Sequence, residues 1–292
     1  MKKFGDRRDG KRLKDLNGMN YIMYHIKKKR SESEVYINYS IDVTELVKYI
    51  NKFDKEKEHI TYFHAFSTAV AKVFYNRPYL NRFIVNGHFY ERNEVLLAFA
   101  QKTQFNDDAK EFMQIFKVNK DDNIFSISER MSKKVQTVRS NKGSGTDDLV
   151  AKIGKMPRPV RGFVVSIFKF LDKHDLVPRS MTKEILYYSS VILSNIGSIG
   201  CKDAIYHNIT DFGTNSVIVT IGKIYKREIV NEEGKKEIRD FCDFGITLDE
   251  RIADGYYFIK SVKLIEVIFK NPKLLEGRCD DKIREEKWLS LV

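Results

Sequence analysis

The sequence predicts a single α/β domain built on a mixed β-sheet, and three observations support this prediction. Segments with alternating apolar and polar residues are interleaved with segments whose apolar residues recur at helical spacing. The 292 residues are 42% hydrophobic, which is enough for a sizeable core. The sequence has no internal repeat and no clear linker. We therefore expect one domain over residues 19–276, preceded by a basic arm (1–18) and followed by a tail (277–292).

The first half of the chain predicts strands and helices in alternation. EVYINYSIDVTELVKYINKF, residues 34–53, has a period of two and then a helical pattern, which indicates a strand followed by a helix. A second helix is expected from Ile60 to about Asn76, because its apolar residues share one face and Pro78 follows it. Next come strands around the turn signal Asn86-Gly87, a strand over 111–119 and a helix over 123–139.

The second half begins with a flexible loop over residues 140–148 and two helical pieces that the tripeptide PRP separates. The second of these pieces, residues 160–174, is amphipathic. Strands are then expected over 189–197, 214–230 and 238–250, and a last helix over 255–269. The segment DERIADG therefore lies where the last strand gives way to the last helix.

The formal net charge of +12 has three candidate explanations: nucleic acid, an anionic membrane surface or a phosphorylated small ligand. Basic runs occur over residues 2–14, 27–30 and 158–161, and no zinc-finger or RNP-like motif accompanies them. We therefore expect no nucleic-acid partner. The basic amphipathic helix over 160–174 suits an anionic membrane surface, but such helices more often pack on a core, so membrane contact is the less favoured interpretation.

The remaining composition indicates a cytoplasmic protein. The charged N-terminus is not followed by the apolar segment of a signal peptide, and the longest apolar stretch, residues 162–171, is too short to span a membrane. Three cysteines, Cys201, Cys242 and Cys279, lack the spacing of metal ligands, so we expect reduced thiols and no metal site. No P-loop or dinucleotide-binding glycine pattern is present.

Three segments in order resemble one enzyme family. The predicted second helix ends in RPYLNRF, which is similar to a "PxLN" helix end. LSNIGSIG, residues 193–200, is similar to an S-N-L-G segment, and ITLDERIADG, residues 246–255, is similar to a D-H-R-x-x-D-G ending. Together they resemble the trimeric acyltransferases that include chloramphenicol acetyltransferase and the catalytic core of dihydrolipoyl acyltransferases. The resemblance spans residues 35–276 and implies their two-layer α/β sandwich.

The family implies a mechanism that uses residues of two subunits. A histidine of one subunit takes a proton from a thiol or hydroxyl acceptor, which attacks an acyl thioester, and a serine of the neighbouring subunit stabilises the oxyanion. Ser194 matches this serine, and Asp254 matches an aspartate that holds the histidine loop through an ion pair. Alternative roles are a hydroxyl that satisfies the strand end for Ser194 and a helix N-cap for Asp254. Arg8 and Arg12 are weak candidates for the ion-pair partner.

The histidine position of the motif holds Glu250. A carboxylic acid, with an ordinary pKa of ~4.3, is a poor base at neutral pH, although burial at an interface can raise the pKa of a carboxylate by several units. Two interpretations stay open. Either Glu250 is a changed catalytic base, or it is a salt-bridge residue of a catalytically inactive protein that keeps the fold.

The resemblance also suggests residues and molecules that contact the site. Asn195, His64 and His207 are the candidate substrate-binding residues, the two histidines being possible substitutes for the missing base. Acyl coenzyme A is the expected donor, the acceptor is a small molecule of unknown identity, and no cofactor is expected to be covalently bound. The family further implies a homotrimer.

Overall fold

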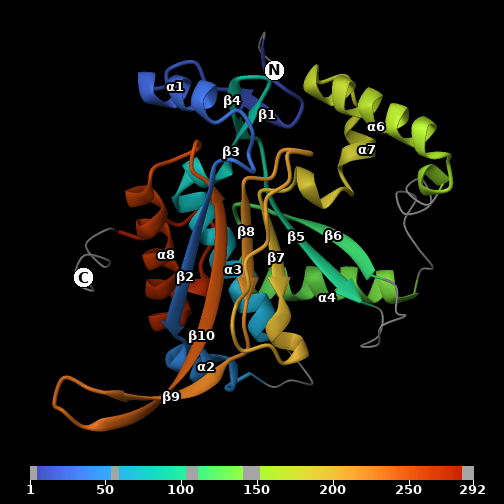
Figure 1. Cartoon of the computed structure of the whole chain (residues 1–292). Coiled ribbons are helices and arrows are strands. Elements are labelled where there is room, and N and C mark those ends of the chain that lie inside the picture. The colour runs from blue at the N-terminus through green and yellow to red at the C-terminus, as the bar shows by residue number, and fades with distance from the viewer. Residues whose placement is uncertain (1–4, 54–58, 103–110, 141–151, 285–292) are drawn as a thin grey trace.

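The structure, a computed structural model, describes residues 5–53, 59–102, 111–140 and 152–284 (Figure 1). Its centre is a mixed seven-stranded sheet in the order β2-β10-β8-β7-β5-β6, with β9 also paired to β10. The β5–β7 and β7–β8 pairs are parallel, and the other pairs are antiparallel. The strands are β2 (Glu34–Asp42), β5 (Val95–Lys102), β6 (Glu111–Val118), β7 (Val191–Asn195), β8 (Val217–Ile221), β9 (Tyr225–Val230) and β10 (Lys236–Asp249).

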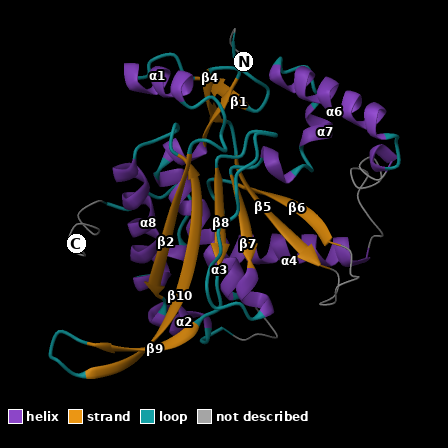
Figure 2. Cartoon of the chain, in the orientation of Figure 1, coloured by secondary structure: helices purple, strands orange, loops and turns teal. Residues whose placement is uncertain are grey.

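Four helices form the second layer, on one face of this sheet (Figure 2). They are α2 (Thr44–Ile50), α3 (Tyr62–Asn76), α4 (Ile124–Ser140) and α8 (Gly255–Lys270). The core between the layers includes three aromatic rings, Phe66, Phe244 and Phe269, whose centroids lie 5.4–6.0 Å apart. The predicted two-layer α/β architecture with a mixed sheet is confirmed.

A smaller sheet joins the N-terminal arm to the domain. It consists of β1 (Gly10–Arg12), β4 (His88–Arg92) and β3 (Arg82–Val85). Strand β1 was not predicted from the sequence, because three residues are too few to show a period of two. A side chain at Gly10 would lie 2.8 Å from the ring of Phe83, so the close approach of β1 requires glycine. The boundaries at residues 18 and 276 remain predictions, although parts of both ends pack on the domain.

The segment predicted as one strand over residues 214–230 is two strands. β8 ends at Ile221, and β9 begins at Tyr225. A side chain at Gly222, between them, would lie 2.2 Å from the carbonyl oxygen of Lys202. The backbone here is therefore packed against another segment, and the pairing of the strand is interrupted. The prediction of a continuous strand was wrong because this contact is tertiary and leaves no periodic signal.

Two helices lie outside the two layers. They are α1 (Gly18–Ile26) and α6 (Arg158–Lys173), and neither contains a buried residue. In Figure 1 they stand on either side of the N-terminus at one end of the molecule, with the short helix α7 (Arg179–Thr182) beside α6. The remaining helical turns are η1 (Pro78–Asn81), η2 (Leu186–Tyr188), η3 (Ile196–Ile199) and η4 (Pro272–Glu276). Within the described part of the chain, no helix combines the length and the apolar character needed to cross a bilayer.

Candidate active site at the two ends of the sheet

The segment DERIADG connects β10 to α8 as predicted. Asp249 is the last residue of β10, and Asp254 caps the N-terminus of α8 by accepting a hydrogen bond from the backbone N–H of Tyr257 at 2.7 Å. Glu250 lies at the start of the turn between them. Its backbone N–H donates to the carbonyl oxygen of Ser33 at 2.9 Å, which fixes the turn to the segment that precedes β2.

The Glu250 carboxylate is 29% exposed and forms an ion pair with the Lys27 ammonium group. Glu250 lines a cavity of about 630 Å³ together with Asp254 and residues of α1. The carboxylate is therefore reachable from solvent and already has a cationic partner. The partner, Lys27, belongs to the same chain and lies outside the motif, so whether Glu250 forms a salt bridge between subunits stays open.

A stack of two tyrosines and two arginines forms another wall of this region. The rings of Tyr79 and Tyr257 are stacked with their centroids 4.7 Å apart. The guanidinium of Arg82 lies 3.3 Å from the Tyr79 centroid, and that of Arg77 lies 3.7 Å from the Tyr257 centroid. Because Tyr79, Tyr257 and Arg82 line the cavity, its occupant would meet aromatic surface and a guanidinium group.

A buried ionic cluster of Asp249, Arg251 and Arg30 supports the turn that carries Glu250. The Arg251 guanidinium binds both carboxylate oxygens of Asp249 at 2.8 Å and donates to the carbonyl oxygens of Lys27 and Lys28 at 3.0 and 3.1 Å. Arg30 approaches the same carboxylate at 3.9 Å. All three charged side chains are at most 4% exposed. Arg251 thus ties the turn to the segment that carries Lys27.

Among the residues that the structure describes, Asp254 has no ion pair that would match the implied role of a loop-holding aspartate. Its side chain is exposed and serves as the N-cap of α8, while Asp249 has the loop-holding contacts. The two weak candidates for its partner lie elsewhere. Arg8 donates to the carbonyl oxygen of Val177, and Arg12 contacts the ring of His88.

Ser194 lies near the end of β7, beside Thr220 of β8 in the parallel register. Register partners project their side chains to the same face of a sheet, so the two hydroxyls are neighbours. The Thr220 hydroxyl is buried and has no hydrogen-bond partner among the described residues. Asn195 follows Ser194, and Gly197 lets the next turn pack closely, since a side chain there would lie 2.3 Å from the Gly222 carbonyl oxygen.

Ser194 and Glu250 of one chain lie at opposite ends of the sheet. Across the register, Ser194 pairs with Thr220, and Thr220 pairs with Gly245. Glu250 follows Gly245 by five positions along β10, which corresponds to ~17 Å at ~3.4 Å per residue. Strand register fixes this offset, so no side-chain rotation can bring the two groups together.

An irregular segment, residues 200–216, connects the parallel strands β7 and β8 by crossing the second face of the sheet. It starts at the Ser194 end, where the carbonyl oxygen of Ile205 would lie 2.9 Å from a side chain at Gly245. It reaches the Glu250 end, where Arg30 donates to the carbonyl oxygens of Thr210 and Gly213 at 2.8 and 3.1 Å. His207 lies exposed in this segment. The roles of His207 and Asn195 in substrate binding stay predictions.

His64 has a structural position. It is the third residue of α3 and forms a capping box with Thr61, in which its ring Nδ1 accepts from the Thr61 backbone N–H at 3.3 Å. Burial lowers the pKa of His64 to about 4. The ring is therefore neutral and engaged at the helix end, and its proposed substrate contact has no support from these contacts.

The residues that hold Glu250 in place were not predicted from the sequence. Lys27 and Arg30 belong to the run KKKR, which was treated only as a basic surface, and Asp249 and Arg251 flank Glu250 in the motif. The available signal was the adjacent pair of opposite charges in DER, since a buried arginine needs a carboxylate nearby.

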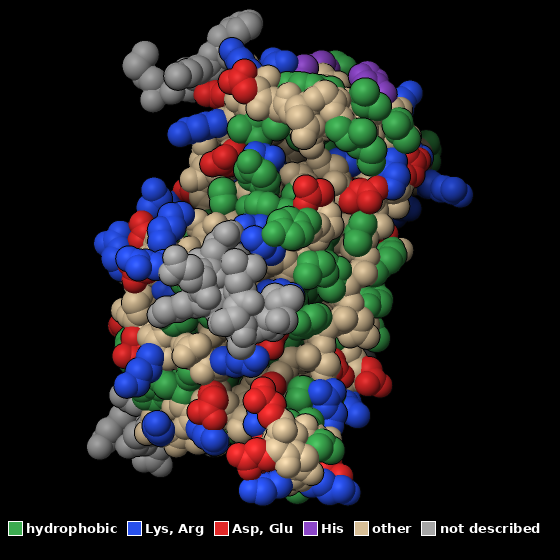
Figure 3. Space-filling model, turned by 90° about the vertical axis from the view of Figure 1, so that its left-hand side faces the viewer, with side chains coloured by type: hydrophobic (Ala, Val, Ile, Leu, Met, Phe, Trp, Pro, Cys, Tyr) green, Lys and Arg blue, Asp and Glu red, His purple; other side chains and the backbone are tan. Residues whose placement is uncertain are grey.

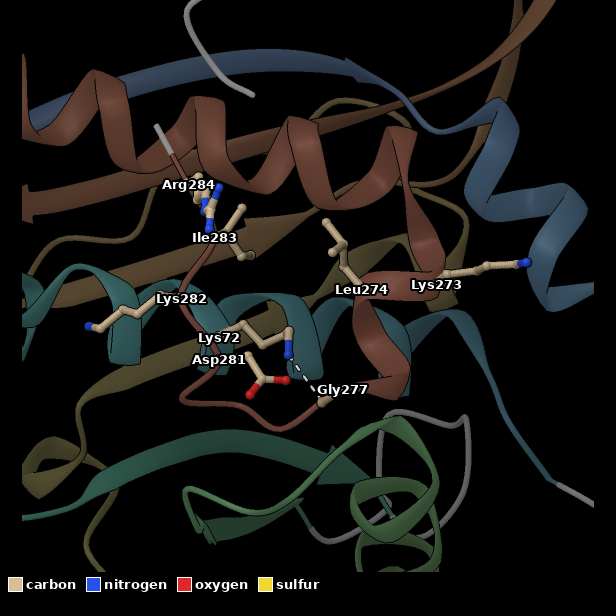
Figure 4. Close-up of a pocket in the computed structure, with 8 residues that line it drawn as sticks. All are labelled: Lys72, Lys273, Leu274, Gly277, Asp281, Lys282, Ile283 and Arg284. Atoms are coloured by element: carbon tan, nitrogen blue, oxygen red, sulfur yellow. Dashed lines mark hydrogen bonds between the residues drawn. The ribbon is translucent and has the colours of Figure 1, made fainter. Parts of the chain in front are cut away.

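A second cavity, of about 370 Å³, lies between α3 and the chain after η4 (Figure 4). Lys72 is 1% exposed and donates to the carbonyl oxygens of Gly277, at 3.0 Å, and Arg278, which fastens residues 277–278 to α3. In Figure 4, Lys273 and Lys282 point away from each other. Lys273 and Lys282 therefore do not converge on one point, and Lys72 acts as a structural tie.

The described residues include no cluster of three or more His, Cys, Asp or Glu side chains that could hold a metal ion. The three cysteines are free. Burial raises the pKa of Cys242 and of Cys279 to about 12, so these two thiols are unreactive at neutral pH.

Comparison with known proteins places this geometry in a family of folds. Residues 178–276, which include Ser194, Glu250 and Asp254, match the model of the 2-oxoacid dehydrogenases acyltransferase catalytic domain. A search of curated proteins found no match.

Solved structures resemble this chain over most of its length. A probable dihydrolipoamide acetyltransferase from Listeria monocytogenes is 19% identical, with a TM-score of 0.58 over 90% of this chain and 95% of that one. The dihydrolipoamide acetyltransferase of Azotobacter vinelandii is 12% identical, with a TM-score of 0.60 over 90% and 93%. A chloramphenicol acetyltransferase is 12% identical, with a TM-score of 0.52 over 85% and 92%. The predicted resemblance is confirmed: the chain has the fold of the acyltransferase family that includes chloramphenicol acetyltransferase and the dihydrolipoyl acyltransferase cores.

Proposed function

We propose that the protein is an acyltransferase that moves an acyl group from a thioester, acyl coenzyme A, to a small thiol or hydroxyl acceptor. The separation of Ser194 and Glu250 carries this proposal. Ser194 matches the serine of its motif and Glu250 stands at the histidine position, yet the two lie at opposite ends of one sheet. A site that uses both must therefore form between two copies of the chain, which is the arrangement that the family resemblance implies.

The proposed reaction uses two groups of the protein. The Glu250 carboxylate takes the proton of the acceptor, whose sulfur or oxygen attacks the thioester carbonyl carbon. The Ser194 hydroxyl of a second copy donates a hydrogen bond to the oxyanion that forms, and one such donor typically contributes ~100- to 1000-fold in rate. Collapse breaks the carbon–sulfur bond, and the departing thiolate takes the proton back from Glu250. No metal or bound cofactor is needed in this scheme.

Assembly into a homotrimer is part of the proposal, and α1 is the contact that we favour. Its exposed Met19, Ile22 and Ile26 follow one another at helical spacing, and hydrophobic side chains gather over this end of the molecule in Figure 3. α1 contains no Lys, Arg, Asp or Glu, so two copies can meet there without burying unpaired charge. Met19 also lines the Glu250 cavity, which would place the neighbouring copy beside the site.

A second candidate is a catalytically inactive trimer that uses the same cavity to bind a ligand or partner. The Lys27–Glu250 ion pair favours it, because the carboxylate is already engaged in a structural contact with an ammonium group. In this case Glu250 would stabilise the site without exchanging protons.

Release of coenzyme A from a panel of acyl coenzyme A donors distinguishes the two candidates. Wild type, Glu250→Gln and Glu250→His are compared with a mixture of thiol and hydroxyl acceptors. Turnover by wild type that falls ~100- to 10,000-fold in Glu250→Gln supports a working base. Turnover by Glu250→His alone supports the inactive candidate with an otherwise intact site. If no variant turns over but coenzyme A binds, the acyl-transfer proposal fails.

Subunit complementation tests the shared site directly. Glu250→Gln and Ser194→Ala chains are each inactive alone, but a mixed trimer contains interfaces that pair an intact Glu250 with an intact Ser194. Random mixing of equal amounts in a cyclic trimer restores about a quarter of the sites. As the control, Glu250→Gln is mixed with the double variant Glu250→Gln/Ser194→Ala. No intact site can form in this mixture, because neither chain has Glu250. Absence of recovery in the first mixture, with mixed trimers present, would contradict the shared site.

A further inference from the structure

The helix α6 is held against the domain along one side only. The ring of Phe168 contacts that of Phe212 with the centroids 5.7 Å apart. Near the C-terminal end of the helix, the carbonyl and carboxylate oxygens of Asp172 accept hydrogen bonds from the buried Arg7 at 2.7 and 3.0 Å. These contacts fix the orientation of α6, so the side that faces away from the domain is a defined surface.

That outer side carries an apolar stripe. Val160, Phe163, Ile167 and Phe170 follow one another at spacings of three and four residues, so they share one face of the helix. Their exposed fractions are 47, 67, 43 and 61%. Single exposed apolar residues are normal on protein surfaces, but a continuous row with two phenylalanines marks an interaction site. The sequence favoured core packing for this helix, and the structure leaves the stripe uncovered.

Basic residues accompany the stripe. α6 carries Arg158, Arg161, Lys169 and Lys173, and none of them forms an ion pair within the described residues. The one acidic residue of the helix, Asp172, is already bound to Arg7. The outer surface of α6 therefore offers apolar side chains together with uncompensated positive charge.

This combination decides between the possible occupants. A second copy packed stripe against stripe would bring the cations that flank both stripes close together without acidic partners, which is unfavourable at a contact between protein surfaces. α1, which we assign to contact between copies, has no such charges. A helix with an apolar face and flanking Lys and Arg residues is the form that lies in the plane of an anionic membrane surface, with its cations near the lipid phosphates.

We propose that α6 docks the protein on an anionic membrane surface, with Phe163 and Phe170 inserted among the lipid headgroups. In Figure 1, α6 stands at the outer edge of the molecule, away from the sheet, so a planar surface can approach it. The inference does not depend on acyl transfer, because it involves neither Glu250 nor Ser194.

Co-sedimentation of the full chain with vesicles tests the proposal. Phosphatidylcholine vesicles with and without phosphatidylserine are compared, each at low and high salt. We expect binding only to the vesicles that contain phosphatidylserine, with affinity that decreases as salt increases. The double variant Phe163→Ser/Phe170→Ser should bind at least ~10-fold more weakly, because it lacks the two aromatic side chains that the membrane would bury. Lys169→Glu/Lys173→Glu should lose the preference for phosphatidylserine.

The matched control is Ile238→Ser, which removes an equally exposed apolar side chain (68%) from β10, outside α6. It should bind like wild type, and circular dichroism checks that every variant is folded. Three outcomes would overturn the proposal: no vesicle binding by wild type, equal loss of binding in the Ile238 control, or a phenylalanine double variant that changes the oligomeric state without changing lipid binding. The last outcome would identify α6 as a contact between copies.

Discussion

Replacing Arg251 with alanine should destabilise the turn that carries Glu250. In the folded protein the Arg251 guanidinium donates four hydrogen bonds, two to the Asp249 carboxylate and two to the carbonyl oxygens of Lys27 and Lys28. The exposed fractions of Arg251 and Asp249 are 3% and 0%. The substitution would therefore leave a buried carboxylate and two carbonyl groups without these partners.

The magnitude follows from this geometry. Removing one partner of a buried ion pair typically costs ~3–5 kcal/mol. Arg30 remains 3.9 Å from the Asp249 carboxylate and compensates part of its charge, so we expect the lower end of that range. The free energy of unfolding should fall by about 3 kcal/mol in Arg251→Ala. Arg251→Lys keeps the charge but lacks the planar guanidinium group that binds both carboxylate oxygens. Its free energy of unfolding should therefore fall by about 1–2 kcal/mol.

Urea denaturation, with all variants at the same protein concentration, measures these differences. The control is Lys236→Ala, which removes an ion pair with Glu228 in which both side chains are more than half exposed. That change should cost less than about 1 kcal/mol, because surface pairs contribute little. If Arg251→Ala were no more destabilising than this control, the buried cluster would not support the turn. Acyl transfer should fall in Arg251→Lys as well, since the Lys27 segment is released.

Three further predictions concern other parts of the structure. Burial lowers the pKa of His64 to about 4, so the unfolded chain binds a proton between pH 6.5 and 4 that the folded chain does not. The stability that comes from the neutral ring is present above pH 6.5 and is lost as the pH falls towards 4. The comparison variant is His64→Gln, which keeps a capping side chain but does not titrate. Between pH 7 and pH 4, the free energy of unfolding in urea should fall by up to about 3 kcal/mol more in wild type than in this variant. Gly197→Ala should lower acyl transfer at least ~10-fold, because its Cβ would lie 2.3 Å from the Gly222 carbonyl oxygen, whereas Gly154→Ala, with open space around it, should be neutral in the same assay. Ile22→Asp should dissociate the trimer in light scattering, since it places a charge in the uncharged α1 contact; an unchanged mass would exclude α1 from the interface.

The positions of Ser194 and Glu250 were predictable because they follow from local patterns. Ser194 lies near the end of a short strand with a strong apolar pattern, and Glu250 lies between a long strand and an amphipathic helix. Strand and helix periods place such residues at the ends of elements without knowledge of the tertiary structure. The mixed sheet was predictable from the order of strands and helices along the chain, and its helical layer from the family resemblance.

The partners of Glu250 were not predictable in this way. Lys27 lies 223 positions away in the sequence, in an irregular segment after α1 that has no period. Its pairing depends on how β2 and β10 align, which places Glu34 opposite Asp249 and brings the preceding segment to the turn. His64 illustrates the opposite case. Its three-residue spacing from Thr61 is the spacing of a capping box and is visible in the sequence, whereas the substrate role came only from the family resemblance.

The register of the sheet makes assembly a condition of the proposed chemistry. The ~17 Å offset between Ser194 and Glu250 along the strands is set by backbone hydrogen bonds, which neither a rotamer change nor a loop movement can alter. A monomer with this fold therefore cannot use both groups, whatever the basicity of Glu250. A trimer alone does not establish turnover, because an inactive protein would keep the same interface. The feature that separates the two cases is the Lys27–Glu250 ion pair, since a catalytic Glu250 must exchange its ammonium partner for the acceptor's proton during each cycle.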